Sequence, residues 1–210
     1  MAAPKVERFS SALIPLPAEN VDTDQIVPAR YLKVVVKSGL ADALFHDWRF
    51  NEDGTKKTPP FVLDDPRYAG RGILVAGDNF GTGSSREHAP WALDAFGIKA
   101  VISTSFADIF KNNALKNGIL PISVDATVHA QLMDVARSGD AAQVSVDLAS
   151  AALTTPGGAV VKFAIDPFAQ KMLLEGLDEL DYIRTQSDKI EAHETSHPGT
   201  INTLQPNASQ

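Results

Sequence analysis

The stretch Gly77-Asp-Asn-Phe-Gly-Thr-Gly-Ser-Ser-Arg-Glu-His-Ala-Pro-Trp-Ala-Leu93 joins an apolar run to a helical pattern through a glycine-rich loop. The preceding run, Gly72 to Ala76, is short, β-branched and continuous, which predicts a strand buried on both faces of a parallel sheet. The following run, Arg86 to Phe96, places apolar residues at helical spacing. This part of the chain therefore predicts a strand, a loop and a helix in that order.

The glycine-rich loop has the composition of an anion-binding catalytic loop. Gly81 and Gly83 allow a tight turn and let backbone N–H groups approach a ligand, while Ser84 or Ser85 can cap the helix. A helix N-terminus carries unpaired donors and partial positive charge, which favour a carboxylate or a phosphate. Arg86 adds a fixed fork of donors that matches a carboxylate. A serine-capped helix without any ligand is the structural alternative.

Three better-known glycine loops do not match this stretch. A Walker A loop requires Gly-Lys-Ser/Thr, and no lysine follows the glycines here. A dinucleotide-binding fingerprint requires a third glycine at the position of Arg86. A nucleophile elbow requires glycine on both sides of the serine, whereas Arg86 and Glu87 follow the serine pair. These mismatches disfavour a nucleotide-dependent enzyme.

Length and composition indicate an ordinary globular chain. Its 210 residues are 44% hydrophobic and 21% charged, which fits one domain with a substantial core. The formal net charge of −7 gives no general field that would attract nucleic acid. No apolar stretch approaches a membrane span and residues 1–11 lack a signal peptide's pattern, so we expect a cytoplasmic protein.

The chain contains no cysteine. This composition excludes disulfides, thiolate nucleophiles and cysteine-held iron–sulfur clusters within this chain. Any such cluster would have to belong to a partner.

Strands and helices alternate after the central loop, as in a parallel α/β layer. Short apolar strands with a Pro-Gly-Gly turn follow, and they indicate a hairpin in a smaller second sheet before a final helix. The expected elements are strands over 98–104 and 119–124, helices over 106–117 and 127–138, strands over 143–148, 152–154 and 159–164, and a helix from 166 towards 176.

A second candidate site lies at Asn20 to Leu32, where two acids precede a short apolar step and an arginine. Pro28 favours an extended or turn conformation, so this is expected to be a loop following a strand, and a simple Asp-containing turn is the alternative. His46 has no partner nearby in the sequence and is interpreted as a surface or packing residue rather than a ligand. Asn112 and Asn113 are expected to bond local backbone groups.

Residues 79–93 resemble the signature of the aconitase swivel-domain family, in the form found in small subunits of isopropylmalate isomerase. The resemblance implies a swivelling β/β/α domain with a mainly parallel sheet, flanking helices and a smaller second sheet, and it extends from about Phe9 to about His197. Further motifs match in the family's order at 21–32, 105–113 with 116–121, and 166–168 with 173–178.

The resemblance implies a two-chain hydro-lyase active only with its large subunit. Such an enzyme interconverts 2-isopropylmalate and 3-isopropylmalate through 2-isopropylmaleate in leucine biosynthesis. The large subunit is expected to supply the four-iron, four-sulfur cluster that binds the leaving hydroxyl as a Lewis acid. The alternatives are the small subunit of a related dehydratase, of the methylmalate or homoaconitate type, and a non-catalytic anion-binding module.

The same resemblance assigns roles to particular residues. It makes Ser84 the catalytic base and Asp24 a second catalytic residue, and it places Ser85, Arg86 and Arg30 at the substrate. Two positions depart from the family, because Thr82 and Ala114 stand where cysteine is common. The loop backbone of the implied site comprises Gly81, Thr82 and Gly83.

The C-terminal part contains a false metal motif. His193-Glu-Thr-Ser-His197 matches the zincin pattern, but Pro198-Gly199 follows at once, the neighbours are polar and no third ligand lies downstream. We therefore expect no metal site in this chain. A single domain is expected over residues 1–198, followed by a polar, disordered tail over 199–210.

Overall fold

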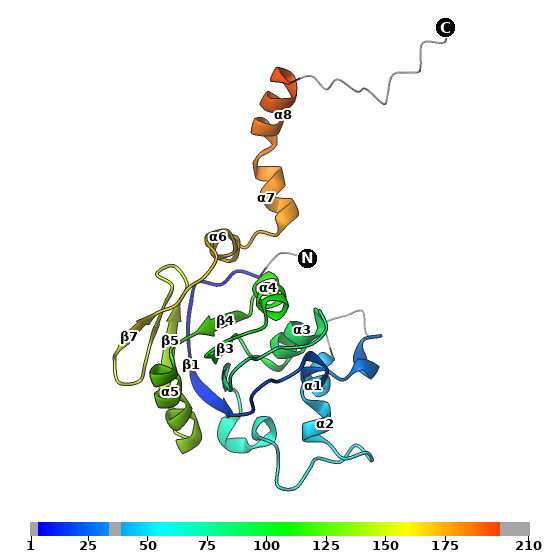
Figure 1. Ribbon diagram of the computed structural model, residues 1–210, viewed down its shortest axis with the longest axis vertical. Coiled ribbons are helices and arrows are strands. Elements are labelled where there is room, and N and C mark those ends of the chain that lie inside the picture. Colours follow the sequence, from blue (N-terminus) through cyan, green and yellow to red (C-terminus); the bar gives the residue numbers. More distant parts are fainter. Residues whose placement is uncertain (1–3, 34–38, 198–210) are drawn as a thin grey trace.

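The computed structural model describes residues 4–33 and 39–197, and it shows a sheet with helices on both faces and a C-terminal arm that projects from this body (Figure 1). The strands are β1 Arg8–Leu16, β2 Ile73–Ala76, β3 Ala100–Ser103, β4 Leu120–Ser123, β5 Gln143–Asp147, β6 Ala152–Thr154 and β7 Val160–Lys162. The helices are α1 Thr23–Ile26, α2 His46–Arg49, α3 His88–Phe96, α4 Asp108–Lys116, α5 Ala126–Ser138, α6 Pro167–Glu175, α7 Glu179–Thr185 and α8 Ser187–Ser196.

The seven strands form one mixed sheet in the order β4-β3-β2-β1-β5-β6-β7. Strand β1 joins two halves, because Leu13 to Leu16 pair in parallel with β2 while Arg8 to Ala12 pair antiparallel with β5. Strands β1 to β4 are parallel, and β5 to β7 are antiparallel. The α/β class is confirmed, but the sheet is mixed rather than mainly parallel, because three strand pairs are parallel and three are antiparallel. The expected smaller sheet is the antiparallel half attached through β1.

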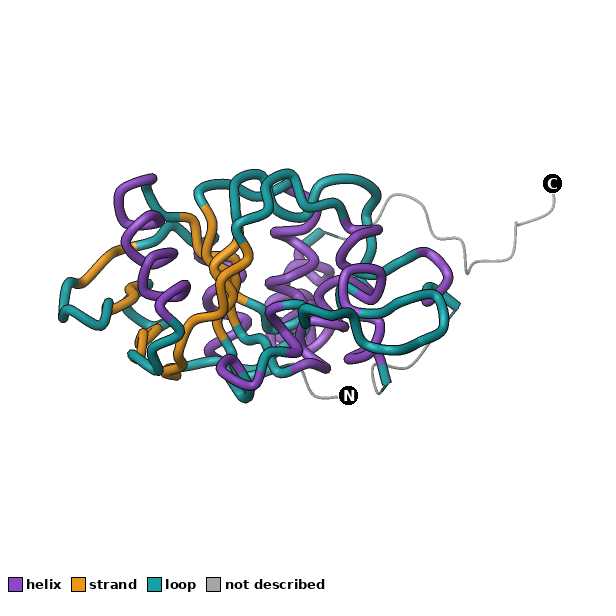
Figure 2. Tube along the Cα trace, turned by 90° about the horizontal axis from the view of Figure 1, so that it is seen from below, coloured by secondary structure: helices purple, strands orange, loops and turns teal. Residues whose placement is uncertain are grey.

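The core lies on both faces of the sheet. Along β2, Leu74 and Ala76 pack into one hydrophobic cluster while Ile73 and Val75 pack into the other, as the two-residue alternation of a strand requires. The first cluster contains residues of α1, α3 and α4, and the second contains residues of α5 and α6. Figure 2 shows the strands between helices on two sides. The predicted burial of this strand on both faces is confirmed.

A buried ion pair holds α2 to the segment that leads towards β2. The Arg49 Nε and Nη2 atoms donate to the Asp64 carboxylate at 2.8 and 3.1 Å, and both side chains are about 95% buried. Burial alone would raise the pKa of Asp64, but hydrogen bonds from Arg49 and Lys56 outweigh it and lower that pKa. The negative charge of Asp64 is therefore fully compensated inside the protein.

The C-terminal arm consists of α7 and α8, in which no residue is buried. At its base the Phe168 and Tyr182 rings meet edge to face with centroids 5.0 Å apart, and Lys116 pairs with Glu179 at 2.8 Å. None of the helices in the described ranges is long and apolar enough to cross a membrane. The expected tail over 199–210 lies outside the described residues.

The zincin-like motif lies at the end of α8. The His193 and His197 rings stack with centroids 4.4 Å apart. Among the residues that the structure describes, no three histidine, cysteine, aspartate or glutamate side chains form a metal-binding group.

Candidate active site at the carboxyl edge of the parallel strands

Loops that follow β1, β2 and β3 meet at the carboxyl edge of the sheet. The Asp78 carboxylate accepts hydrogen bonds from Thr104 Oγ1 and Ser105 Oγ, both at 2.6 Å. The Asn20 N–H donates to the Asp78 carbonyl at 2.9 Å. The hydroxyl bonds from Ser105 and Thr104 lower the pKa of Asp78. Asp78 thus ties three loops together at the edge where open α/β sheets bind ligands.

The glycine-rich loop is fastened to the loop that follows β1. The N–H groups of Gly81 and Thr82 donate to the Val21 carbonyl at 2.8 and 3.1 Å. The Thr23 N–H donates to the Thr82 carbonyl at 2.8 Å, and the Thr23 hydroxyl donates to the Ser84 carbonyl at 2.9 Å. The prediction that the loop N–H groups face a ligand is therefore wrong for Gly81 and Thr82, because both are used within the chain.

Both loop glycines have the left-handed backbone that a tight turn requires. Gly81 has φ +83° and Gly83 has φ +88°. A Cβ atom at Gly81 would lie 2.3 Å from the Phe110 ring, and one at Gly83 would lie 2.2 Å from a carboxylate oxygen of Asp22. The predicted turn is confirmed, and close side-chain packing explains why glycine is needed at both positions.

The start of the central helix differs from the sequence prediction. Helix α3 begins at His88, not at Arg86, and its N-cap residue Glu87 makes no side-chain capping bond. The prediction that Ser84 or Ser85 caps the helix is therefore wrong. Both serines remain in the loop, where the Thr23 contact to the Ser84 carbonyl draws the backbone towards α1.

The two serines present their side chains at the surface. Both are exposed, and the Ser84 hydroxyl makes no hydrogen bond with any residue that the structure describes. The Ser85 hydroxyl accepts a hydrogen bond from Asn113 Nδ2 at 3.3 Å. The expectation that Asn113 bonds local backbone groups is wrong for this amide. No pattern in the sequence links two residues 28 positions apart, so Asn113 was missed as a neighbour of the site.

Asp24 and Arg86 form a two-point ion pair across the two loops. Arg86 Nη1 and Nη2 donate to the two carboxylate oxygens of Asp24, the second at 2.9 Å. The Asp22 side chain caps α1 by accepting from the Asp24 N–H, which fixes Asp24 on that helix. The structure therefore brings together two predicted site residues, and Asp24 already occupies the carboxylate-binding fork of Arg86.

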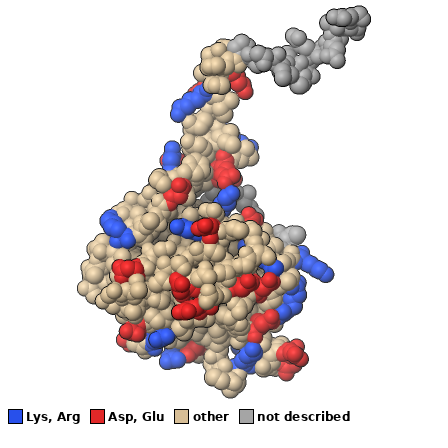
Figure 3. All heavy atoms as spheres, in the orientation of Figure 1, with Lys and Arg blue, Asp and Glu red and all other residues tan. Residues whose placement is uncertain are grey.

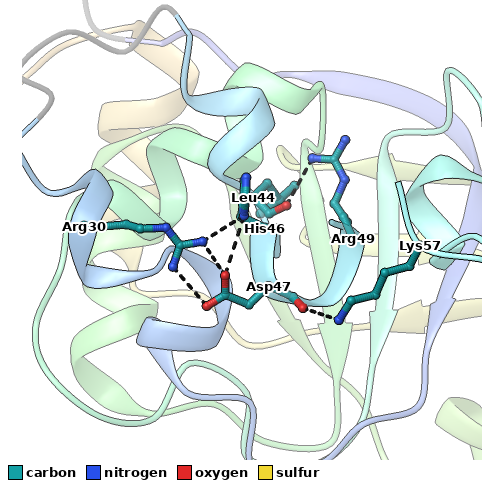
Figure 4. Close-up of polar contacts among 6 residues, drawn as sticks. All are labelled: Arg30, Leu44, His46, Asp47, Arg49 and Lys57. Carbon is teal, nitrogen blue, oxygen red and sulfur yellow. Dashed lines mark hydrogen bonds and ion pairs between the residues drawn. The ribbon is translucent and has the colours of Figure 1, made fainter. Parts of the chain in front are cut away.

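Arg30 bonds to α2 rather than to the serine loop (Figure 4). Its Nη1 donates to Asp47 Oδ2 at 3.2 Å, and its Nη2 lies 2.8 Å from His46 Nδ1. Because arginine only donates, His46 Nδ1 accepts and the proton of its neutral ring is on Nε2. The hydrogen bond from Arg30 lowers the pKa of Asp47. The expectation that His46 has no partner is wrong, since it contacts Arg30 directly. Its packing role is confirmed, because its ring lies against the rings of Tyr31 and Phe50 with centroids 5.1 and 4.7 Å away.

Comparison with known proteins places the chain in a family. The sequence model of the aconitase C-terminal domain matches residues 3–127, and a second model, LeuD_N, matches residues 130–167. The chain is 55% identical to a 3-isopropylmalate dehydratase small subunit of Solibacter usitatus, over 93% of this chain and 96% of that protein. It is 51% identical to the 3-isopropylmalate dehydratase small subunit of Roseiflexus castenholzii, over 92% of this chain and 94% of that protein.

A solved structure shows the same fold. The crystal structure of 3-isopropylmalate dehydratase from Methanocaldococcus jannaschii aligns with a TM-score of 0.62 at 26% sequence identity. The alignment covers 89% of this chain and 99% of that protein.

Proposed function

The chain belongs to the family of 3-isopropylmalate dehydratase small subunits, which carry the aconitase C-terminal domain, and from this premise we propose its activity. Together with a large subunit it interconverts 2-isopropylmalate and 3-isopropylmalate through 2-isopropylmaleate, in leucine biosynthesis. The observation that supports this activity best is the exposed Ser84 hydroxyl, which bonds none of the residues that the structure describes and lies two residues from Arg86 in the sequence. A base and a carboxylate clamp are the two groups that this dehydration needs from one side of its substrate.

Ser84 is the proposed base. It would remove the proton from the carbon next to a substrate carboxylate, while the hydroxyl on the neighbouring carbon leaves. A serine hydroxyl is a weak base, so the deprotonated alkoxide that accepts this proton has to be stabilised beforehand by nearby positive charge and donors. Arg86 lies on the same loop and supplies a guanidinium. Ser85 is proposed to bond the substrate, with its hydroxyl oriented by Asn113.

Arg86 is the proposed carboxylate clamp, and Asp24 is proposed to hold it ready. A substrate carboxylate has the same two-oxygen geometry as the Asp24 side chain, so it can replace Asp24 on the fork. The Asp24 side chain is 50% exposed, so water can solvate its carboxylate when it leaves the fork, whereas the Arg86 side chain is only 16% exposed. Arg30, by its bonds to His46 and Asp47, is proposed to orient its own loop beside the substrate.

The partner's contribution follows from what this chain lacks. The sequence has no cysteine, and no metal-binding group occurs among the described residues, so its side chains do not fit the expected four-iron, four-sulfur cluster. We place that cluster in the large subunit. The residues of this chain supply the base, the clamp and the loop that carries them.

Substitution of Arg86 by lysine is expected to raise KM about tenfold with a smaller change in kcat. Lysine keeps the charge but loses the two-point fork, so substrate binding weakens while the base remains in place. Steady-state kinetics of the assembled enzyme measure both constants. Arg67→Lys is a matched control, because Arg67 also forms a pair with an aspartate, Asp65, but on exposed surface. Equal kinetics for Arg86→Lys and wild type would count against the clamp.

An anaerobic assay of alkene formation tests the proposed function. This chain, a cluster-loaded large subunit and their mixture are each given 2-isopropylmalate and 3-isopropylmalate. We expect activity only in the mixture. An assembled mixture that converts methylmalate or homoaconitate but neither isopropylmalate would reassign the enzyme to a related dehydratase. An assembled mixture without any dehydratase activity would favour an anion-binding module.

A further inference from the structure

Exposed apolar side chains gather on one region of the molecule. Of the six large hydrophobic residues that are exposed in the described ranges, five lie on α4, α6, α7 and α8. An apolar groove of roughly 530 Å³ lies between α4, α6 and α7, and Leu115, Met172 and Leu177 line it. The sixth exposed residue, Val160, lies on β7. The five clustered residues are Ile109, Phe168, Leu180, Ile183 and Ile190.

We infer that this region, comprising the arm of α7 and α8 and the groove at its base, is the surface on which the large subunit docks. The inference rests on the proposed function, because that function requires a second chain. Helices α7 and α8 have only 7 and 10 residues, and neither contains a buried residue. Isolated helices shorter than about 12 residues are marginal in water, so packing against another surface is needed to stabilise them.

The charge of the arm argues against a second copy of this chain as the occupant. Residues 178–197 carry six acidic side chains, and their only lysine and arginine are Lys189 and Arg184. This segment therefore has a formal net charge of −4, which is more than half of the chain's −7. Figure 3 shows acidic side chains on the arm as well as on the body. Two arms packed against each other would bring like charges together. A different chain with an apolar strip and a basic rim fits this surface.

Helix α4 connects the docking region to the candidate active site. Asn113 of α4 bonds the Ser85 hydroxyl, and Ile109 lies one turn earlier on the same helix face with 49% of its surface exposed. Asn112 and Lys116 of the same helix line the groove. Helix α4 therefore contributes residues both to the serine site and to the groove at the base of the arm, so a chain that covers the exposed serines also meets α4. The large subunit is that chain.

The test compares two variants of the full chain, each of which replaces one exposed apolar residue by glutamate. Ile183→Glu changes an exposed apolar residue of the arm, and Val160→Glu makes the same kind of change on β7. Glutamate forms helices at least as well as isoleucine, so Ile183→Glu keeps the helical preference of α7. The dissociation constant for the cluster-loaded large subunit is measured anaerobically by calorimetry, and the thermal midpoint of each isolated variant is recorded.

We expect Ile183→Glu to weaken binding about tenfold or more, and Val160→Glu to bind within about twofold of wild type. Ile183→Leu, which stays apolar, should bind as wild type does. Wild-type affinity for Ile183→Glu would overturn the inference, and so would an equal loss in both glutamate variants. A dimer of the chain alone that Ile183→Glu dissolves, with large-subunit binding intact, would assign the arm to a second copy.

Turnover separates this inference from the proposed function. At saturating large subunit, Ile183→Glu should recover wild-type turnover of isopropylmalate, because the arm holds no group of the site. A wild-type complex that binds tightly but converts no isopropylmalate would refute the function and leave the docking surface standing.

Discussion

Replacement of Ser84 by alanine is expected to lower kcat of the assembled enzyme about 100- to 10,000-fold, which is the usual contribution of a positioned base. The hydroxyl is exposed and has no partner within the described residues, so its removal breaks no hydrogen bond of the fold. The Ser84 carbonyl still accepts from the Thr23 hydroxyl, which keeps the loop attached to α1. Stability and assembly with the large subunit should therefore remain unchanged.

Ser85→Ala is the matched control for this result. It removes the neighbouring hydroxyl and its 3.3 Å contact with Asn113, and we expect a loss of turnover smaller by at least about tenfold. Single-turnover kinetics at saturating substrate measure the chemical step directly. Near-normal turnover in Ser84→Ala, with subunit assembly intact, would remove Ser84 from the role of base.

Replacement of Arg49 by alanine is expected to lower the free energy of unfolding by about 3–5 kcal/mol, because it leaves one partner of a buried pair without its counter-charge. The Asp64 side chain is only 4% exposed and would retain a single basic partner, Lys56. The Arg49 Nη1 atom also donates to the Ala41 and Leu44 carbonyls at 2.8 and 3.1 Å, as Figure 4 shows for Leu44. Those carbonyls would lose a buried donor as well.

Arg67→Ala provides the comparison, because Arg67 pairs with Asp65 while its own side chain is 65% exposed. We expect it to cost about 1 kcal/mol or less. Urea unfolding of the isolated chain, monitored by circular dichroism, measures both variants. Equal losses would show that the Arg49 pair adds no more than a surface pair does.

The lowered pKa of Asp64 contributes stability above about pH 4, and this contribution is lost as the pH falls through that lowered value.

Local sequence patterns were sufficient to predict much of the parallel half of the sheet and its loops. The continuous apolar runs of β2 and β3 predict burial on both faces, and both strands are fully buried. Gly81 and Gly83 predict a tight turn, and both have positive φ. These features depend on neighbours in the chain, so periodicity and backbone preference reveal them.

Features that depend on distant residues could not be predicted in this way. A strand before Asn20 was expected, but the bounds and the central place of β1 were not predicted. Ser10, Ser11 and Pro15 interrupt its apolar run, and only pairing on both edges makes it central. The Arg86–Asp24 pair joins residues 62 positions apart. The same loop-to-loop contacts keep the serines away from the cap of α3. The arm was missed because its sequence is polar and none of the residues in the described ranges buries it.

The position of β1 sets the order in which its two ends can pair with neighbouring strands during synthesis. Leu13 pairs with Ile73, but Arg8, in the same strand, pairs with Asp147. One end of β1 can therefore find its partner early, while the other must wait until about two thirds of the chain has left the ribosome. Such long-range pairing closes large loops and slows folding. Until residues 143–147 emerge, the outer edge of β1 presents unpaired N–H and C=O groups, and the nascent chain is most open to wrong strand pairing during that interval.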